Sequence, residues 1–252
     1  MEPAAILHTR SRGDGSVAVV LHPSLGRPGS DFDDLAARLA AAGYRTLALD
    51  PRGIKASPAP VEADLHDLAR DVLQAVDLAG IDRAHFVGHA FGNRVSRCLA
   101  ADHPGRVLSI TLLAAGGKVE ADAEARAALR RCFADPMQGA EHLEAVRTAF
   151  FAPGNDVPDD WRTGWFPAAA ASQSAATRRT NVDDWWGASQ MPLLVVQGLQ
   201  DRIAPPENGR TLARERPNTT LVEIDGAGHA LLPEQPQPVA EAVLALLDRL
   251  AQ

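Results

Sequence analysis

Short apolar runs that alternate with amphipathic helical patterns restrict the folds open to this chain. From residue 16 onward six such runs occur, at residues 16–22, 44–51, 84–89, 107–117, 191–199 and 219–228. Helical patterns occupy residues 30–43, 62–80, 91–105, 205–217 and 236–252. This alternation predicts βαβ units and therefore an α/β protein, with a mostly parallel central sheet that is flanked by helices on both faces.

Local signals predict how the first elements begin and end. An apolar run at 4–10 is separated from the run at 16–22 by the residues SRGDG, which predict a β-hairpin. Ser30 and Asp33 resemble a capping box at the start of the first helix. Gly43 is expected to end that helix, and Gly80 the next one.

The alternation stops between Lys118 and Gln190. This segment is rich in alanine and prone to form helices, and it contains no convincing strand pattern. Because the strand–helix rhythm returns afterwards, a helical insertion explains the sequence more economically than a second independent domain. We therefore expect a core of residues 1–117 and 191–252, with a helical cap or lid at residues 118–190.

The sequence HFVGHAFGNR at residues 85–94 has the glycine spacing of a nucleophile elbow. Such an elbow is a tight turn between a strand and a helix, and it needs small residues two positions on either side of the nucleophile. Gly88 and Gly92 meet this requirement. The nucleophile position itself holds Ala90, whose side chain has no atom that could attack a substrate.

Two later segments place an acid and a histidine just beyond predicted strands. Asp201 lies in VVQGLQDRIAPP, and His229 lies in the glycine-rich turn of GAGHALLPEQP. The acid is placed to orient a histidine, and the histidine can reach back over the sheet. The chain order of elbow, acid and histidine is that of the α/β-hydrolase triad.

Together with LHPSLGRPGSDF (21–32) and LALDPRG (47–53), these segments resemble α/β-hydrolase-fold proteins with a helical cap, over essentially the full chain. The resemblance implies that Asp201 and His229 are the catalytic acid and base and that Ala90 occupies the nucleophile position. It also implies an oxyanion hole built by Ser24 or Leu25 together with Phe91.

This sequence also departs from the family pattern outside the elbow. Pro23 stands where a glycine commonly follows the histidine of the oxyanion loop, and residues 54–57 replace the usual small-residue turn.

Ala90 leaves three interpretations open. In the first, it is an engineered substitution that inactivates a serine hydrolase, such as an esterase or lactonase, without preventing substrate binding. In the second, it is natural, and His229 with Asp201 acts as a general base on water or on a substrate proton, which allows hydrolysis or lyase or isomerase chemistry. In the third, the scaffold binds a small ligand and catalyses nothing, although a pure binder has no obvious need for the acid–histidine pair.

Aromatic side chains are concentrated in the predicted lid. They are expected to form a wall against a small, largely apolar ester or lactone, with five candidates for substrate binding: Trp161, Trp165, Phe166, Trp185 and Trp186. The alternative is that these rings only pack the short helices of the lid together.

The composition and the sequence pattern indicate which kinds of partner and which cellular location to expect. The net charge of −7 disfavours nucleic acid and acidic membranes as partners. Neither a signal peptide nor an apolar stretch long enough to span a membrane is evident, so a cytoplasmic protein is expected. No metal or cofactor motif is recognised, and the expected partner is a small-molecule substrate. The sequence leaves open whether the protein is a monomer or a homodimer.

Overall fold

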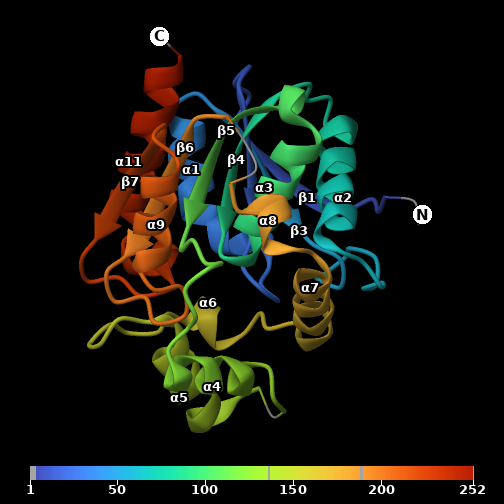
Figure 1. Ribbon diagram of the computed structural model, residues 1–252. Helices are drawn as coiled ribbons and strands as arrows, with labels where there is room; N and C mark the ends of the chain where they lie inside the picture. Colours follow the sequence, from blue (N-terminus) through green and yellow to red (C-terminus); the bar gives the residue numbers. More distant parts are fainter. Residues whose placement is uncertain (1–3, 136, 188–189, 252) are drawn as a thin grey trace.

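The computed structural model describes residues 4–135, 137–187 and 190–251 and is built around one central sheet (Figure 1). The sheet has seven strands: β1 (His8–Arg12), β2 (Ala18–His22), β3 (Arg45–Asp50), β4 (Ala84–His89), β5 (Val107–Leu113), β6 (Leu193–Gly198) and β7 (Thr219–Ile224). Their order is β1-β3-β2-β4-β5-β6-β7, and β1 pairs antiparallel with β3 while the other pairs are parallel. The predicted α/β class with a mostly parallel sheet is confirmed.

The predicted hairpin at the N-terminus is wrong. β1 does not pair with β2 but with β3, so that Thr9 lies opposite Leu49. Both edges of β2 are occupied, by β3 on one side and β4 on the other. The chain after SRGDG therefore enters the middle of the sheet, and β1 joins at the outer edge of β3.

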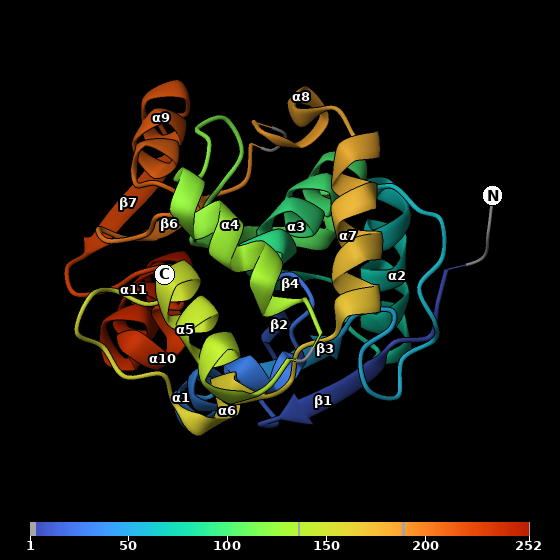
Figure 2. The ribbon, with the colours of Figure 1, turned by 90° about the horizontal axis from the view of Figure 1, so that it is seen from below.

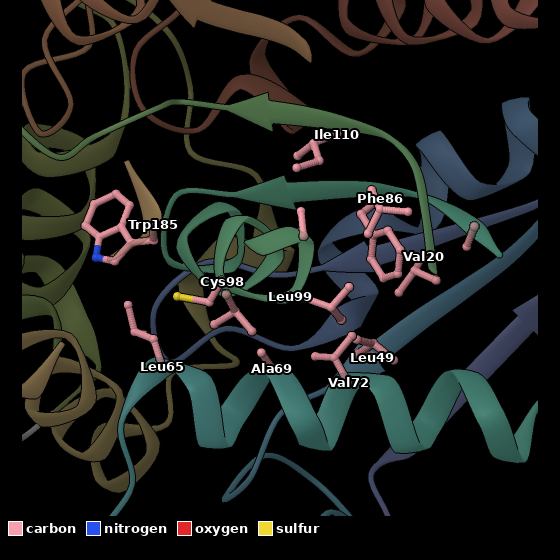
Figure 3. Close-up of a cluster of buried hydrophobic side chains, with 14 of the residues drawn as sticks. Val20, Leu49, Leu65, Ala69, Val72, Phe86, Cys98, Leu99, Ile110 and Trp185 are labelled. Carbon is pink, nitrogen blue, oxygen red and sulfur yellow. The ribbon is translucent and has the colours of Figure 1, made fainter. Parts of the chain in front are cut away.

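Helices cover both faces of the sheet. The core contains α1 (Asp33–Ala41), α2 (Leu65–Leu78), α3 (Phe91–Asp102), α9 (Glu207–Glu215), α10 (Leu231–Glu234) and α11 (Pro236–Leu250), with 3-10 turns η1 (Gly29–Phe32) and η2 (Pro104–Arg106). Because side chains alternate along a strand, Val19 and Leu21 of β2 pack with α1 and α11, whereas Val20 packs with α2 and α3. Figure 3 shows Val20 beside Phe86 and close to Val72 of α2.

The predicted capping box at Ser30 does not form. Residues 29–32 make the 3-10 turn η1, which places Ser30 one turn before α1, and its hydroxyl instead accepts a hydrogen bond from Lys55. A capping box does begin α2, where Asp64 and Asp67 each accept a hydrogen bond from the other's backbone N–H. Gly43 and Gly80 follow α1 and α2 with positive φ, as expected for helix ends.

The chain between β5 and β6 forms the helices α4 (Ala123–Cys132), α5 (Gly139–Phe150), α6 (Asp159–Arg162), α7 (Pro167–Arg179) and α8 (Val182–Trp185). We call residues 118–187 the helical insertion. Figure 1 shows α4, α5, α6 and α7 at the end of the molecule where β5 leads out of the sheet, and Figure 2 shows this end face on. The insertion therefore lies over the edge at which the parallel strands end, where sites in α/β folds usually form.

Within the described ranges, no helix has the length and apolar character needed to cross a membrane.

Candidate active site

The turn between β4 and α3 has the backbone of a nucleophile elbow, although its central side chain is a methyl group. Ala90 has φ of 48° and ψ of −101°, a conformation that L-residues rarely adopt. Its N–H donates a hydrogen bond to the Leu113 carbonyl oxygen at 2.9 Å, and its own carbonyl accepts one from Asn93 at 3.2 Å. The surrounding structure thus holds residue 90 in a strained conformation of the kind found at functional sites.

Gly88 and Gly92 are required by close packing around this turn. A Cβ on Gly88 would lie 2.4 Å from the Asn93 backbone nitrogen, and one on Gly92 would lie 2.2 Å from the His22 carbonyl oxygen. Both neighbours are backbone atoms, which cannot move away as a flexible side chain could. The glycine spacing recognised in the sequence therefore has a steric cause.

Replacing Gly92 with alanine is expected to lower the free energy of unfolding by about 2 kcal/mol, because the methyl group forces α3 away from β2. Urea unfolding at neutral pH measures this change. Gly105→Ala is the matched control, since a Cβ there meets no atom within 4 Å. Equal unfolding midpoints for the two variants would contradict this account of the elbow.

Asp201 and His229 form a buried pair. Asp201 follows β6, and its Oδ2 lies 2.9 Å from His229 Nδ1. Its Oδ1 accepts hydrogen bonds from the backbone N–H groups of Ile203 and Ala204, at 2.9 and 2.7 Å. With the carboxylate acting as acceptor, Nδ1 of the ring carries the proton. Nε2 keeps its lone pair and can accept a second proton.

Two neutral histidines support this arrangement. Burial lowers the pKa of His89 to about 3, and its Nε2 lies 2.7 Å from the carbonyl oxygen of His229. Burial likewise lowers the pKa of His22 to about 4, and its Nδ1 lies 3.2 Å from the Pro23 carbonyl oxygen in the loop after β2. Both rings are therefore uncharged near pH 7 and can donate hydrogen bonds to those carbonyls. These hydrogen bonds hold the backbone at His229 and at Pro23.

A cavity of about 250 Å³ brings five of the expected site residues together. Its lining includes Ala90 and His229 as well as all three expected oxyanion-hole residues: Ser24, Leu25 and Phe91. The backbone N–H groups of Leu25 and Phe91 have no hydrogen-bond acceptor within the described part of the chain. These groups are therefore available to a carbonyl oxygen in the cavity.

The rest of the lining is mainly apolar and comes from both the core and the helical insertion: Arg94, Ala114, Gly116, Leu129, Phe150, Ser174, Thr177, Ile203 and Ala204. Phe150 is the aromatic residue of the insertion that contacts His229, with the two ring centroids 5.5 Å apart. Such a lining suits a small molecule with an apolar body and few polar groups.

The five aromatic residues expected to bind substrate are not in this lining. Trp161 and Trp165 each lie 4.5 Å from the guanidinium of Arg27, and Trp161 lines a separate cavity together with Phe166.

Trp185 and Trp186 instead pack against Arg97 of α3, with its guanidinium carbon 4.5 and 5.3 Å from the two rings. The tryptophans of the insertion therefore pack against buried arginines. Among the aromatic residues of the insertion, Phe150 lines the cavity.

Sequence reasoning did not single out Arg94, which also lines the cavity. A signal for it was present, because residues four apart on a helix share a face and Arg94 follows Ala90 by four positions.

Comparison with known proteins agrees with this architecture. A family model described as alpha/beta hydrolase fold matches residues 17–143 and 157–236, and the chain belongs to this family. It is 32% identical to a protein named "Putative carbamate hydrolase RutD" from Variovorax paradoxus (strain S110), over 98% of this chain and 96% of the relative.

A second relative, the rhodomycin D methylesterase DauP of Streptomyces sp. (strain C5), is 30% identical, over 84% of both chains. Among solved structures, a hydrolase from Pseudomonas aeruginosa PA01 is similar with a TM-score of 0.81 and 26% identity, over 96% of this chain and 94% of that chain. These relatives are named as hydrolases.

Proposed function

We propose that this protein hydrolyses a small, largely apolar ester or lactone by direct attack of water, without a covalent intermediate at position 90. His229 is the general base, and Asp201 orients its ring and stabilises the protonated form. The backbone N–H groups of Leu25 and Phe91 form the oxyanion hole. Ala90 leaves beside the substrate carbonyl the space that a nucleophilic side chain would fill.

The reaction then has two steps. Nε2 of His229 takes a proton from water as the water oxygen bonds to the carbonyl carbon, and the carbonyl oxygen becomes an oxyanion held by the two N–H groups. When the oxyanion collapses, the bond to the leaving oxygen breaks, and protonated His229 gives its proton to that oxygen. The products are a carboxylic acid and an alcohol, or a single hydroxy acid from a lactone.

The observation that carries the proposal is the His229–Asp201 contact of 2.9 Å, with His229 in the lining of the cavity that also contains Ala90. A general base must be within hydrogen-bond reach of the proton that it removes, and a water between Nε2 and a bound carbonyl meets that condition. A protein that only bound ligands would gain nothing from a buried imidazole oriented by a carboxylate.

The names of the relatives support the choice of substrate class. RutD is named for hydrolysis of a carbamate and DauP for hydrolysis of a methyl ester. Carbamates and esters are both carbonyl compounds that hydrolysis cleaves through a tetrahedral oxyanion, for which the proposed oxyanion hole is suited.

Turnover of a panel of small aliphatic and aryl esters and lactones tests this function. We expect acid release that follows enzyme concentration for at least one apolar member of the panel. Proton transfer at a substrate carbon is the competing chemistry, favoured by the absence of a nucleophile at Ala90. Running the panel in D₂O separates the two, because deuterium entering substrate carbon without acid release would contradict hydrolysis, as would an inert panel.

A further inference from the structure

The guanidinium of Arg94 lies in the wall of the cavity and has no acidic partner among the residues that the structure describes. It lies on α3 one turn beyond Ala90, and both residues line the cavity. Its Nε is buried and makes no hydrogen bond within the described residues, and no carboxylate there forms an ion pair with the side chain. The ring of Trp185 lies 5.5 Å from its Cζ, and burial lowers the pKa of Arg94.

Two fully buried arginines, Arg27 and Arg97, have hydrogen-bond partners. Arg27 forms an ion pair with Asp31 at 2.8 Å, and both side chains are almost fully buried. Arg97 donates hydrogen bonds to Asn93 Oδ1 at 2.8 Å and to the Gly116 carbonyl oxygen at 3.1 Å. The chain thus provides acceptors for arginines that serve its own packing, and Arg94 is the exception among these three.

The charge around Arg94 also favours an anion. Arg97 lies close enough for Arg94 to help lower its pKa to about 9, although burial is the larger cause. Two guanidinium groups therefore lie near each other on α3, although only that of Arg94 lines the cavity, and neither forms an ion pair within the described residues. The net charge of the protein is −7. A cavity with apolar walls strengthens the attraction between such a charge and an anionic ligand.

We propose that the substrate carries a carboxylate, held by Arg94, in addition to the carbonyl that faces His229. This inference deepens the proposed function and rests on it for the position of the reacting carbonyl. Because Arg94, Ala90 and His229 line one cavity of about 250 Å³, the carboxylate and the reacting carbonyl belong to one small molecule. The geometry thus selects a half-ester or a lactone acid over a neutral ester.

A matched pair of ligands that resist hydrolysis tests this site by binding. Adipamate has a carboxylate at one end and an amide at the other, whereas adipamide has neutral amides at both ends. By isothermal titration calorimetry, we expect the unmodified chain to bind adipamate at least about tenfold more tightly than adipamide. Equal affinities, tighter binding of adipamide, or binding of neither ligand would overturn the proposal.

Variants at Arg94 assign the preference to that side chain. Arg94→Gln is expected to reduce the affinity ratio of adipamate over adipamide below about twofold. Arg94→Lys is expected to retain most of this ratio, because the positive charge remains. Arg126→Gln is the control, because Arg126 is half exposed on α4 and pairs with the exposed Glu120. If Arg94→Gln is folded, as checked by circular dichroism, and still prefers adipamate as strongly as the unmodified chain does, another group binds the carboxylate and the proposal is overturned.

The binding experiment tests the carboxylate site and the turnover experiment tests the hydrolytic function, so each proposal can fail without the other. If the ester panel is inert but adipamate binds through Arg94, the anion site stands and the hydrolytic function does not. If neutral esters are hydrolysed and the ligand pair is not discriminated, hydrolysis stands and the carboxylate requirement is lost.

Discussion

Replacing His229 with alanine is expected to lower kcat/KM for the best ester or lactone by about a thousandfold or more. In the proposed mechanism, the substitution removes the group that takes the proton from water and returns it to the leaving oxygen. The oxyanion donors remain, so a small residual rate above the uncatalysed reaction is expected. Initial rates over a range of substrate concentrations, with folding checked by thermal unfolding, measure the effect.

His66 provides the control for this substitution. It also pairs with an aspartate, since its Nδ1 lies 2.8 Å from Oδ2 of Asp102, but both side chains are partly exposed and neither lines the cavity. His66→Ala is therefore expected to leave kcat/KM within about twofold, as surface substitutions usually have small effects. If His229→Ala retained activity comparable to that of His66→Ala, His229 would not be the base.

Exchanging Asp201 for asparagine is expected to lower kcat by about a hundredfold to ten-thousandfold while the fold persists. The amide oxygen can still accept the hydrogen bonds from Ile203 and Ala204 that Oδ1 accepts now. The amide nitrogen, however, faces His229 Nδ1 with hydrogen atoms, which favours the tautomer protonated on Nε2. A ring in that state cannot accept a proton from water.

Asp102→Asn is the matched control, because it changes the carboxylate of the His66 pair in the same way. We expect kcat for that variant to be unchanged. A similar loss of kcat in both variants would mean that the change acts through general stability or charge, and not through the tautomer of His229.

Several features of the site were readable from the sequence because each follows from a short motif at the end of a predicted strand. Gly88 and Gly92 avoid steric contacts within a few residues of Ala90 or with the adjacent strand, so their spacing predicts the turn. The meeting of Asp201 and His229 at 2.9 Å follows once both are placed after neighbouring parallel strands.

Features that depend on distant partners were not readable in this way. The hairpin prediction failed because the partner of β1 depends on the strand order of the whole sheet, in which β2 is already paired on both edges. The positions of the lid tryptophans depend on Arg27 and Arg97, which approach them from distant parts of the chain. Periodicity shows that such rings are buried, but it does not show which surface they contact.

In the proposed mechanism, water activated by His229 attacks the substrate directly. Single-turnover hydrolysis of an ester in ¹⁸O-labelled water, combined with mass spectrometry of the intact protein during the reaction, tests it most directly. We expect one labelled oxygen in the acid product and, as the discriminating result, no acyl adduct on the protein. Ala90→Ser is expected to accumulate an adduct at residue 90. An acyl adduct on the unaltered chain, at Ser24 or elsewhere, would contradict it.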